Sequence, residues 1–222
     1  KYAFKRNRDS RTSFAMTNRK LLRQPHFKNM PRVKKFDEYE VLEKAMNLFW
    51  KQGYSATSVQ DLVTHLGINR ASIYDTYGDK EKLFLKAFEN YRKANTEGII
   101  RFFNGQENVK EGFKQLFEMA IDESIRDQEK KGCFVVNTIT EFIPGDEKIF
   151  KILEENQKTF ETIFLGFLKD GEKKGEFKKG KDLPAIATLL FTLYNGLKVV
   201  SKVNSNKKEL TQSVHQVLSL LD

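Results

Sequence analysis

From Phe36 to the end of the chain, apolar residues recur at the three- and four-residue spacing of an α-helix. In the first such stretch, Leu42, Ala45, Met46 and Phe49 fall at positions i, i+3, i+4 and i+7. Val, Ile and Thr seldom alternate with polar residues, which is the pattern that a half-buried strand requires. Only four prolines are present to interrupt helices. We therefore expect an all-α protein.

Short turns divide this pattern into a series of helices. Gly53 ends the first one, and Thr57-Ser58-Val59-Gln60 has the form of a capping box, in which a Thr hydroxyl and a Gln amide satisfy free backbone N–H groups. The polar run at residues 170–181 predicts a loop. The expected helices cover residues 36–52, 58–65, 70–76, 80–103, 108–126, 133–143, 146–173, 183–202 and 207–221.

The net charge of +9 is concentrated at the N-terminus. Residues 1–29 carry nine Lys or Arg side chains and one acid, Asp9, whereas residues 30–222 carry 30 basic and 29 acidic side chains. Because residues 1–29 also lack a sustained apolar period, we expect a disordered basic segment there. Three interpretations stay open: a translated leader upstream of a start at Met30, a flexible arm that adds DNA affinity without specificity, or an Arg-rich transit peptide.

The sequence offers little for catalysis or metal binding. Its single cysteine, Cys133, excludes an internal disulfide and a Cys-based zinc site, and its three histidines lie far apart. No glycine-rich phosphate loop or nucleophile–base motif occurs. We therefore expect no enzyme, no metal and no cofactor, and a reducing cytoplasm as the location. Cys133 is interpreted as a buried, inert thiol or as a redox or covalent sensor.

The most apolar stretch runs from Leu183 to Val200. Polar residues such as Thr188, Asn195 and Lys198 interrupt it, so it falls short of the roughly 18 uninterrupted apolar residues that indicate a membrane-spanning helix. We interpret it as a buried helix and expect no contact with a membrane.

Residues 36–84 predict a helix-turn-helix. A helix is followed by a short helix, a tight turn at Leu66-Gly67-Ile68 and a second short helix. In such a unit, the second short helix enters the major groove of DNA with its N-terminal residues at the base edges. The side chains expected at bases or phosphates are Asn69, Arg70, Ala71, Ser72, Tyr74, Thr76, Tyr77 and Lys80. The alternative is a helical bundle that binds no DNA, since short helix pairs with a glycine turn occur there as well.

The same segment carries a family resemblance. The matching residues are Ala45 to Phe49, Gly53-Tyr54, Thr57-Ser58-Val59, Leu62, Leu66-Gly67-Ile68, Ser72-Ile73-Tyr74, Tyr77-Gly78 and Lys80-Glu81-Lys82-Leu83. On these residues, the segment 32–84 resembles the DNA-binding domain of the tetracycline-repressor (TetR/AcrR) family of bacterial transcription regulators. Gly132-Cys133-Phe134, with Asn137 and Glu141, also resembles a stretch found in part of that family.

The resemblance implies separate roles for these residues. It implies base contacts from Arg70, Ala71, Tyr74 and Thr76, and phosphate contacts from Thr57, Ser58, Tyr77 and Lys80. Asp75 stands where an aromatic or polar residue is common in the family. Its carboxylate would repel phosphates or accept a hydrogen bond from cytosine N4, and both interpretations stay open.

The resemblance also implies a C-terminal helical bundle that dimerises and holds a small-molecule pocket. The sequence supports a dimer independently, because Leu210, Val214, Val217 and Leu221 form an apolar seam that requires a partner helix. We expect a homodimer through the helices at 183–202 and 207–221, which would read a near-palindromic double-stranded DNA operator. The alternative is that both helices pack only within one chain.

An effector pocket is expected among the inner helices of the bundle. Phenylalanines fall on the inner faces of these helices, and a few polar side chains would orient a ligand. The expected ligand-binding residues are Phe113, Phe117, Asn137, Glu141, Phe160, Phe164, Tyr194 and Asn195. The alternative is that the aromatic residues form only a packed core. The effector is expected to be a partly apolar small molecule of unknown identity.

Together these features predict a ligand-responsive transcription regulator. We expect a helix-turn-helix domain at residues 30–82 and a ligand-binding and dimerisation domain at 83–222, with the boundary inside the long helix that begins near Lys80. A small molecule would release this repressor from DNA, because the long helix would move the two DNA-reading units to a spacing that mismatches the duplex. The alternative is a helix-turn-helix activator or protein-interaction module without an inducer.

Overall fold

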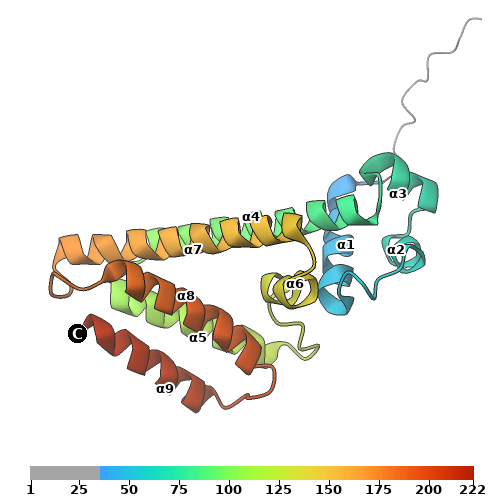
Figure 1. Cartoon of the computed structure of the whole chain (residues 1–222). Helices are drawn as coiled ribbons and strands as arrows, with labels where there is room; N and C mark the ends of the chain where they lie inside the picture. The colour runs from blue at the N-terminus through green and yellow to red at the C-terminus, as the bar shows by residue number, and fades with distance from the viewer. Residues whose placement is uncertain (1–35) are drawn as a thin grey trace, which may run out of the picture. The chain divides into compact units, whose positions relative to one another are not determined.

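The computed structural model describes residues 36–222, whose helices are drawn in Figure 1. The predictions for residues 1–29 lie outside the described residues. Within the described part, nine α-helices and a short final 3-10 helix confirm the predicted all-α fold. The elements are α1 (Glu38–Gln52), α2 (Val59–Leu66), α3 (Arg70–Tyr77), α4 (Lys80–Asn104), α5 (Val109–Arg126), α6 (Phe134–Phe142), α7 (Glu147–Lys174), α8 (Leu183–Val200), α9 (Lys207–Leu218) and η1 (Ser219–Leu221).

Side chains that cap the helix N-termini fix most helix boundaries. Asp79, Asn108 and Asp146 each accept a hydrogen bond from the backbone N–H three residues further on, and so open α4, α5 and α7. At the other end of α7, Gly175 adopts the left-handed conformation (φ 75°) and ends the helix. The loop predicted to begin at residue 170 therefore begins later, because α7 continues to Lys174.

The predicted capping box at the start of α2 is wrong by one residue. Ser58 is the cap, because its hydroxyl accepts the Asp61 backbone N–H at 3.1 Å while the Asp61 carboxylate accepts the Ser58 N–H at 2.8 Å. Thr57 is fully buried instead, and its hydroxyl donates to the Gly53 carbonyl at 2.6 Å. The Thr57 side chain thus closes the turn between α1 and α2.

The first of two hydrophobic cores joins α1–α3 and the start of α4 to α6 and the first turns of α7. Its centre is aromatic. The ring of Phe84 lies with its centroid 5.1–5.8 Å from the rings of Phe49, Tyr54, Phe134 and Phe142, in stacked and edge-on contacts that stabilise such clusters. The core of the helix-turn-helix therefore continues beyond residue 82, and whether a domain boundary lies there stays a prediction.

The second core fills the bundle formed by α5, α7, α8, α9 and the last turns of α4. Figure 1 shows α4 and α7 running side by side, with α5, α8 and α9 together along one side of them. Since α4 begins in the first core and ends in the second, one continuous helix connects α3 to the bundle.

α8 is, among the described residues, the one helix long and apolar enough to cross a membrane by length and mean hydropathy. It packs against α7 and α5, and Tyr194 and Leu197 lie in the second core. Only 28% of the stretch Leu183–Val200 is buried, because residues on the opposite side, such as Leu189 and Val200, stay exposed. An apolar stripe on α8 is therefore left without a partner within the described chain.

The apolar seam of α9 is covered within the chain. Leu210, Val214 and Leu221 are at most 4% exposed and lie in the same core as α5, against which α9 packs. This seam therefore gives no support for a second copy, because α5 already covers it. A dimer through α8 and α9 stays a prediction.

Candidate functional site

A glycine and a cap build the turn between α2 and α3. Gly67 ends α2 in the left-handed conformation (φ 68°), which glycine adopts without strain. Asn69 then opens α3, because its side-chain oxygen accepts the Ser72 backbone N–H at 2.8 Å. Ile73 is 1% exposed and packs the inner face of α3 into the first core. The first turn of α3 is thus fixed while its outer face stays accessible.

The outer face of α3 carries the predicted DNA-reading residues. Arg70 and Tyr74 lie one helical turn apart, with Arg70 Nη2 3.4 Å from the Tyr74 hydroxyl and the guanidinium carbon 5.7 Å from the ring centre. This contact limits the orientations of the guanidinium, whose paired N–H groups match the edge of guanine. Asn69, Arg70, Ala71, Tyr74 and Asp75 are exposed, and Ser72 and Thr76 are half-buried.

Two of the predicted phosphate contacts are wrong. Thr57 is buried against Gly53, as described above. Tyr77 is 3% exposed, and its hydroxyl donates to the Glu38 carbonyl at 3.3 Å. Burial, followed by the nearby Glu38 and Asp37 carboxylates, raises the pKa of Tyr77 to about 12. Both side chains attach α1 to the helix-turn-helix and do not face outward.

Ser58 and Lys80 are accessible on either side of α3. The Ser58 hydroxyl donates to the Asp61 carboxylate at 2.6 Å, and this bond is the main cause that holds the pKa of Asp61 below its ordinary value. The Lys80 ammonium lies 4.2 Å from the centre of the Tyr54 ring. Because the Asp79 side chain already caps α4, a phosphate at this helix end would depend on the charge of Lys80.

Glu141 joins α6 to the turn that follows α1. Its carboxylate accepts the backbone N–H of Tyr54 at 3.0 Å and that of Ser55 at 2.6 Å. Gly53 adopts φ 83° and ψ 165° beside it, and a Cβ there would lie 3.0 Å from Glu141 Oε2. The prediction that Glu141 orients a ligand is therefore wrong, because this carboxylate caps the backbone of the α1–α2 turn.

The phenylalanines predicted to bind a ligand form a packed core instead. They are at most 2% exposed, and they are Phe113, Phe117, Phe160 and Phe164. The ring centroid of Phe164 lies 5.2 Å from that of Phe113 and 6.4 Å from that of Phe160, in edge-on contacts. A ligand would have to displace these rings to enter between them, and their role in ligand binding stays a prediction.

The polar residues of the predicted pocket have partners within the chain. Asn137 accepts a hydrogen bond from Lys202 Nζ at 2.9 Å, and the Asn195 side chain donates to a carbonyl one turn back at 3.1 Å. Both asparagines therefore have partners among the described residues, and their role in ligand binding stays a prediction. Tyr194 is buried, and its ring centre lies 3.9 Å from the Lys198 ammonium. Tyr194 thus lies beside Lys198, which lines a cavity.

That opening is a cavity of about 390 Å³, here called the Trp50 cavity. It lies among α1, α4, α5, α8 and the residues before α6, and its walls include Trp50, Tyr91, Glu123, Asp127, Cys133 and Lys198. The Trp50 indole N–H donates to the Gly132 carbonyl at 3.0 Å. Cys133 Sγ lies 3.9 Å from the Tyr91 hydroxyl and 4.0 Å from Lys198 Nζ.

The sequence prediction missed the residues that line this cavity. Lys198 gave one usable signal, because a lysine within the most apolar stretch of the chain has to be accommodated inside the fold. Trp50 follows the apolar face of α1 and is half-buried, but nothing local in the sequence distinguishes it from an ordinary core residue. Tyr91 gives no local signal.

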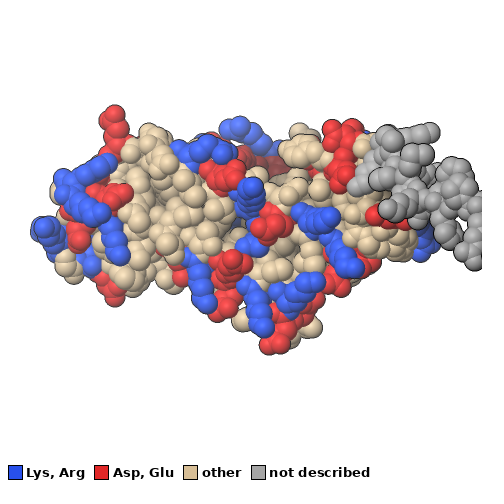
Figure 2. All heavy atoms as spheres, turned by 90° about the horizontal axis from the view of Figure 1, so that it is seen from above, with Lys and Arg blue, Asp and Glu red and all other residues tan. Residues whose placement is uncertain are grey.

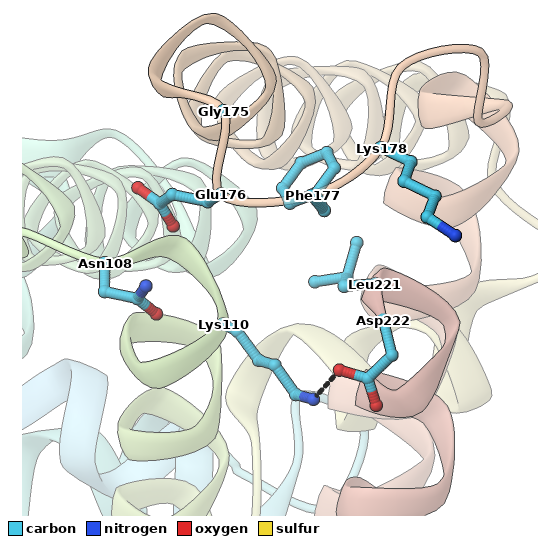
Figure 3. Close-up of a pocket in the computed structure, with 8 residues that line it drawn as sticks. All are labelled: Asn108, Lys110, Gly175, Glu176, Phe177, Lys178, Leu221 and Asp222. Atoms are coloured by element: carbon cyan, nitrogen blue, oxygen red, sulfur yellow. Dashed lines mark hydrogen bonds and ion pairs between the residues drawn. The ribbon is translucent and has the colours of Figure 1, made fainter.

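A second hollow lies where the start of α5, the segment between α7 and α8, and the last residues of the chain meet (Figure 3). Lys110 pairs with Asp222 across it, and the Glu176 carboxylate accepts the Val109 backbone N–H at 2.6 Å. These contacts hold the three segments together, which gives the charged residues here a structural role.

Charges of both signs are mixed on the face drawn in Figure 2. This mixture agrees with the near-neutral composition of residues 30–222. Arg70 and Lys80 are thus local cations on a surface of mixed charge. Within residues 36–222, no group of three or more His, Cys, Asp and Glu side chains could hold a metal ion.

Comparisons with known proteins match both halves of this architecture. The family model described as bacterial regulatory proteins, tetR family, matches residues 41–87, and that of the tetracyclin repressor-like C-terminal domain matches residues 111–217. The HTH-type transcriptional regulator YezE of Bacillus subtilis (strain 168) is 34% identical over 195 residues, which cover 87% of this chain and 100% of YezE. The HTH-type transcriptional repressor ComR of Escherichia coli (strain K12) is 26% identical over 194 residues, which cover 87% of this chain and 92% of ComR.

Solved structures share the fold. A cysteine mutant of the TetR family transcriptional regulator CifR, in complex with 26-bp operator DNA, superposes with a TM-score of 0.75 at 26% identity over 85% of this chain and 98% of CifR. FadR of Bacillus subtilis in complex with stearoyl-CoA gives a TM-score of 0.65 at 19% identity, over 83% of this chain and 97% of FadR. Since the helix-turn-helix, the bundle and the full length of YezE all match, this chain belongs to the TetR family of bacterial HTH-type transcription regulators, which are not enzymes.

Proposed function

We propose that the protein is a dimeric repressor that binds a near-palindromic operator and is released when a small molecule binds to the bundle. Relatives bind operator DNA and small-molecule ligands, and TetR-family regulators are often repressors. The protein would act on the chromosome in the cytoplasm. The long helix α4 would carry the change from the bundle to α3, because α4 begins directly after α3.

The observation that carries this proposal is the exposed face of α3, on which Tyr74 orients the guanidinium of Arg70. Arg70 would bind guanine, and Ala71, Tyr74 and Thr76 would contact neighbouring base edges. Asn69 and Ser72 would support these contacts at the start of the helix. Ser58 and Lys80 would bind phosphates on either side and so set the register of α3 in the groove.

The dimer would form through the uncovered stripe of α8. Leu189, Val199 and Val200 are 40–49% exposed, and Val203 just beyond the helix is 90% exposed. A contiguous apolar stripe on a surface is typical of a protein–protein interface. A two-fold pairing of this stripe would place two copies of α3 about one turn of DNA, ~34 Å, apart, and would therefore favour a near-palindromic operator.

Selection of bound fragments from random DNA by the purified full chain tests the proposal. We expect enrichment of a sequence with two related half-sites. Arg70→Ala should weaken binding to that sequence by about 1–3 kcal/mol for each half-site and relax specificity at one base position. The matched control is Arg126→Ala, which removes an exposed arginine on α5 and should leave binding unchanged. Absence of any enriched sequence would refute the proposal.

Lys80→Ala should behave differently from Arg70→Ala. Because Lys80 would contact only phosphate, its loss should weaken binding to all sequences alike and reduce the salt slope of binding by about one per protomer. Gel-shift titrations at several salt concentrations measure both quantities. A change in base preference on Lys80→Ala would contradict its assignment.

Release by a small molecule is tested separately with ligands that bind the purified protein. Each bound ligand should lower the affinity for the selected DNA, since only a ligand that discriminates between the two conformations shifts their populations. If no bound ligand changed the affinity for DNA, release by a small molecule would be refuted, and the protein would be a regulator without an inducer.

A further inference from the structure

We propose that the Trp50 cavity binds a small organic carboxylate, with the anionic group at Lys198 and the apolar body against Trp50 and Tyr91. This inference rests on the proposed function, because it assigns the chemical class and the place of the effector. The cavity volume of about 390 Å³ lies within the range of small-molecule sites in proteins.

The environment of Lys198 carries the argument. The Lys198 side chain is half-buried on α8, and its ammonium lies 4.0 Å from Cys133 Sγ and 3.9 Å from the centre of the Tyr194 ring. No ion pair joins it to a carboxylate in residues 36–222. An enclosed ammonium without an anionic partner is costly, and a ligand carboxylate would supply the missing partner.

Lys198 keeps its positive charge at neutral pH. Burial lowers its pKa, but the neighbouring Cys133, Tyr194 and Glu123 groups outweigh burial, so the pKa lies above the ordinary value of a lysine. A charged amine in an enclosed space attracts an anion more strongly than one in water.

Neither carboxylate of the cavity wall, Asp127 or Glu123, forms an ion pair with the Lys198 ammonium among the described residues. Asp127 accepts a hydrogen bond from the Gly132 backbone N–H at 3.0 Å and so holds the loop before α6. Glu123 is exposed, and its carboxylate contributes to the raised pKa of Lys198, but no ion pair joins the two in the part of the chain that the structure describes. The second cation of the wall, Lys131, lies 5.1 Å from the centre of the Trp50 ring and pairs with Glu129, so Lys198 is the wall cation without a carboxylate partner within residues 36–222.

The remaining wall suits a flat or short apolar group. The rings of Trp50 and Tyr91 meet edge-on with centroids 5.1 Å apart, and Ala120 of α5 faces the same space. Trp50 belongs to α1 of the helix-turn-helix and Lys198 to α8 of the bundle. A ligand between them would therefore contact both parts at once, and would lie beside the Trp50–Gly132 hydrogen bond, which joins α1 to the segment before α6.

Tryptophan fluorescence offers a direct test, because Trp50 is the only tryptophan in the chain. The probes are benzoate, phenylacetate and hexanoate, each compared with its uncharged amide. We expect saturable changes in emission for at least one carboxylate, with an affinity about tenfold or more above that of its amide, as expected for a charge-assisted contact. Equilibrium dialysis of the same pairs provides a second readout of binding.

Variants assign the preference to Lys198. Lys198→Met retains the length and apolar character of the side chain and should abolish the preference for carboxylate over amide, whereas Lys198→Arg should retain it. Lys93→Met, on the exposed face of α4, is the matched control and should change nothing. Circular dichroism verifies that each variant is folded.

Three results would overturn the inference: no binding of any carboxylate by either readout, equal binding of carboxylate and amide, or a carboxylate preference that survives Lys198→Met. These experiments contain no DNA, and the operator selection contains no ligand. Failure of the inference and failure of the proposed function are therefore distinguishable.

Discussion

Replacement of Gly53 by alanine should destabilise the protein through the turn after α1. Gly53 has φ 83° and ψ 165°, a backbone conformation that is essentially restricted to glycine and costs other residues about 1–3 kcal/mol. A Cβ at this position would also lie 3.0 Å from Glu141 Oε2, so the carboxylate would have to shift and weaken a hydrogen bond worth about 1 kcal/mol. Alanine also lowers the conformational entropy of the unfolded chain, which offsets about 0.4–1 kcal/mol of this loss. We expect a net loss of about 2 kcal/mol in the free energy of unfolding.

The same substitution at Gly98 is the matched control. Gly98 lies inside α4, and a Cβ there meets no atom within 4 Å. Gly98→Ala should therefore stabilise the protein by about 0.5–1 kcal/mol, since alanine favours the helix and limits the unfolded chain. Because both variants change the unfolded state in the same way, the difference between them, about 3 kcal/mol, measures the folded state alone.

Thermal unfolding followed by circular dichroism measures this difference. For a chain of this size, 1 kcal/mol shifts Tm by about 2–4 °C, so the two variants should differ by about 6–12 °C. Protein concentration has to be the same in all samples, since association stabilises the folded state. If Gly53→Ala unfolded at or above the temperature of the unaltered protein, the reasoning about this turn would be refuted.

Three further predictions concern the Glu141 carboxylate, the buried Tyr77 hydroxyl and the Phe164 ring. Glu141→Ala should lower the free energy of unfolding in urea by about 1 kcal/mol, because water replaces part of its two hydrogen bonds to the exposed turn. An equal loss for the control Glu118→Ala would contradict the role of Glu141 as a cap of this turn. The raised pKa of Tyr77 gives stability that is complete below pH 10 and is lost as the pH rises through about 12; Tyr77→Phe should flatten this decline, and superimposable pH profiles would count against a buried hydroxyl. Phe164→Ala should cost about 3–5 kcal/mol, against less than about 1 kcal/mol for the half-exposed Phe150→Ala, and similar losses would indicate a loosely packed core.

Most helix boundaries could be predicted because their signals are local. Asp79 and Asn108 cap helices within three residues of themselves, so the sequence contains both partners. The start of α2 shows the limit of such signals. Thr57 with Gln60 and Ser58 with Asp61 have the same capping spacing, and only the burial of Thr57, a tertiary effect, selects the second pair.

The outer face of α3 and the cavity differ in the same way. That outer face follows from helical periodicity once Ile73 is placed inward, so the exposure of Arg70 could be predicted from the sequence. The aromatic stripes of the bundle gave no such answer, because a packed core and a ligand pocket require the same spacing. Trp50 and Lys198 come together only through the packing of α1 near α8, which no local pattern in the sequence contains.

The aromatic core around Phe84 has a consequence for protein engineering. Phe134 and Phe142 of α6 cover this ring, and Glu141 of the same helix caps the turn after α1. A fragment truncated after α4 would lose that cover, and its apolar interior would face water. Chimaeras that exchange operator specificity between relatives should therefore transplant α6 together with α1–α3, so that the ring of Phe84 keeps its cover.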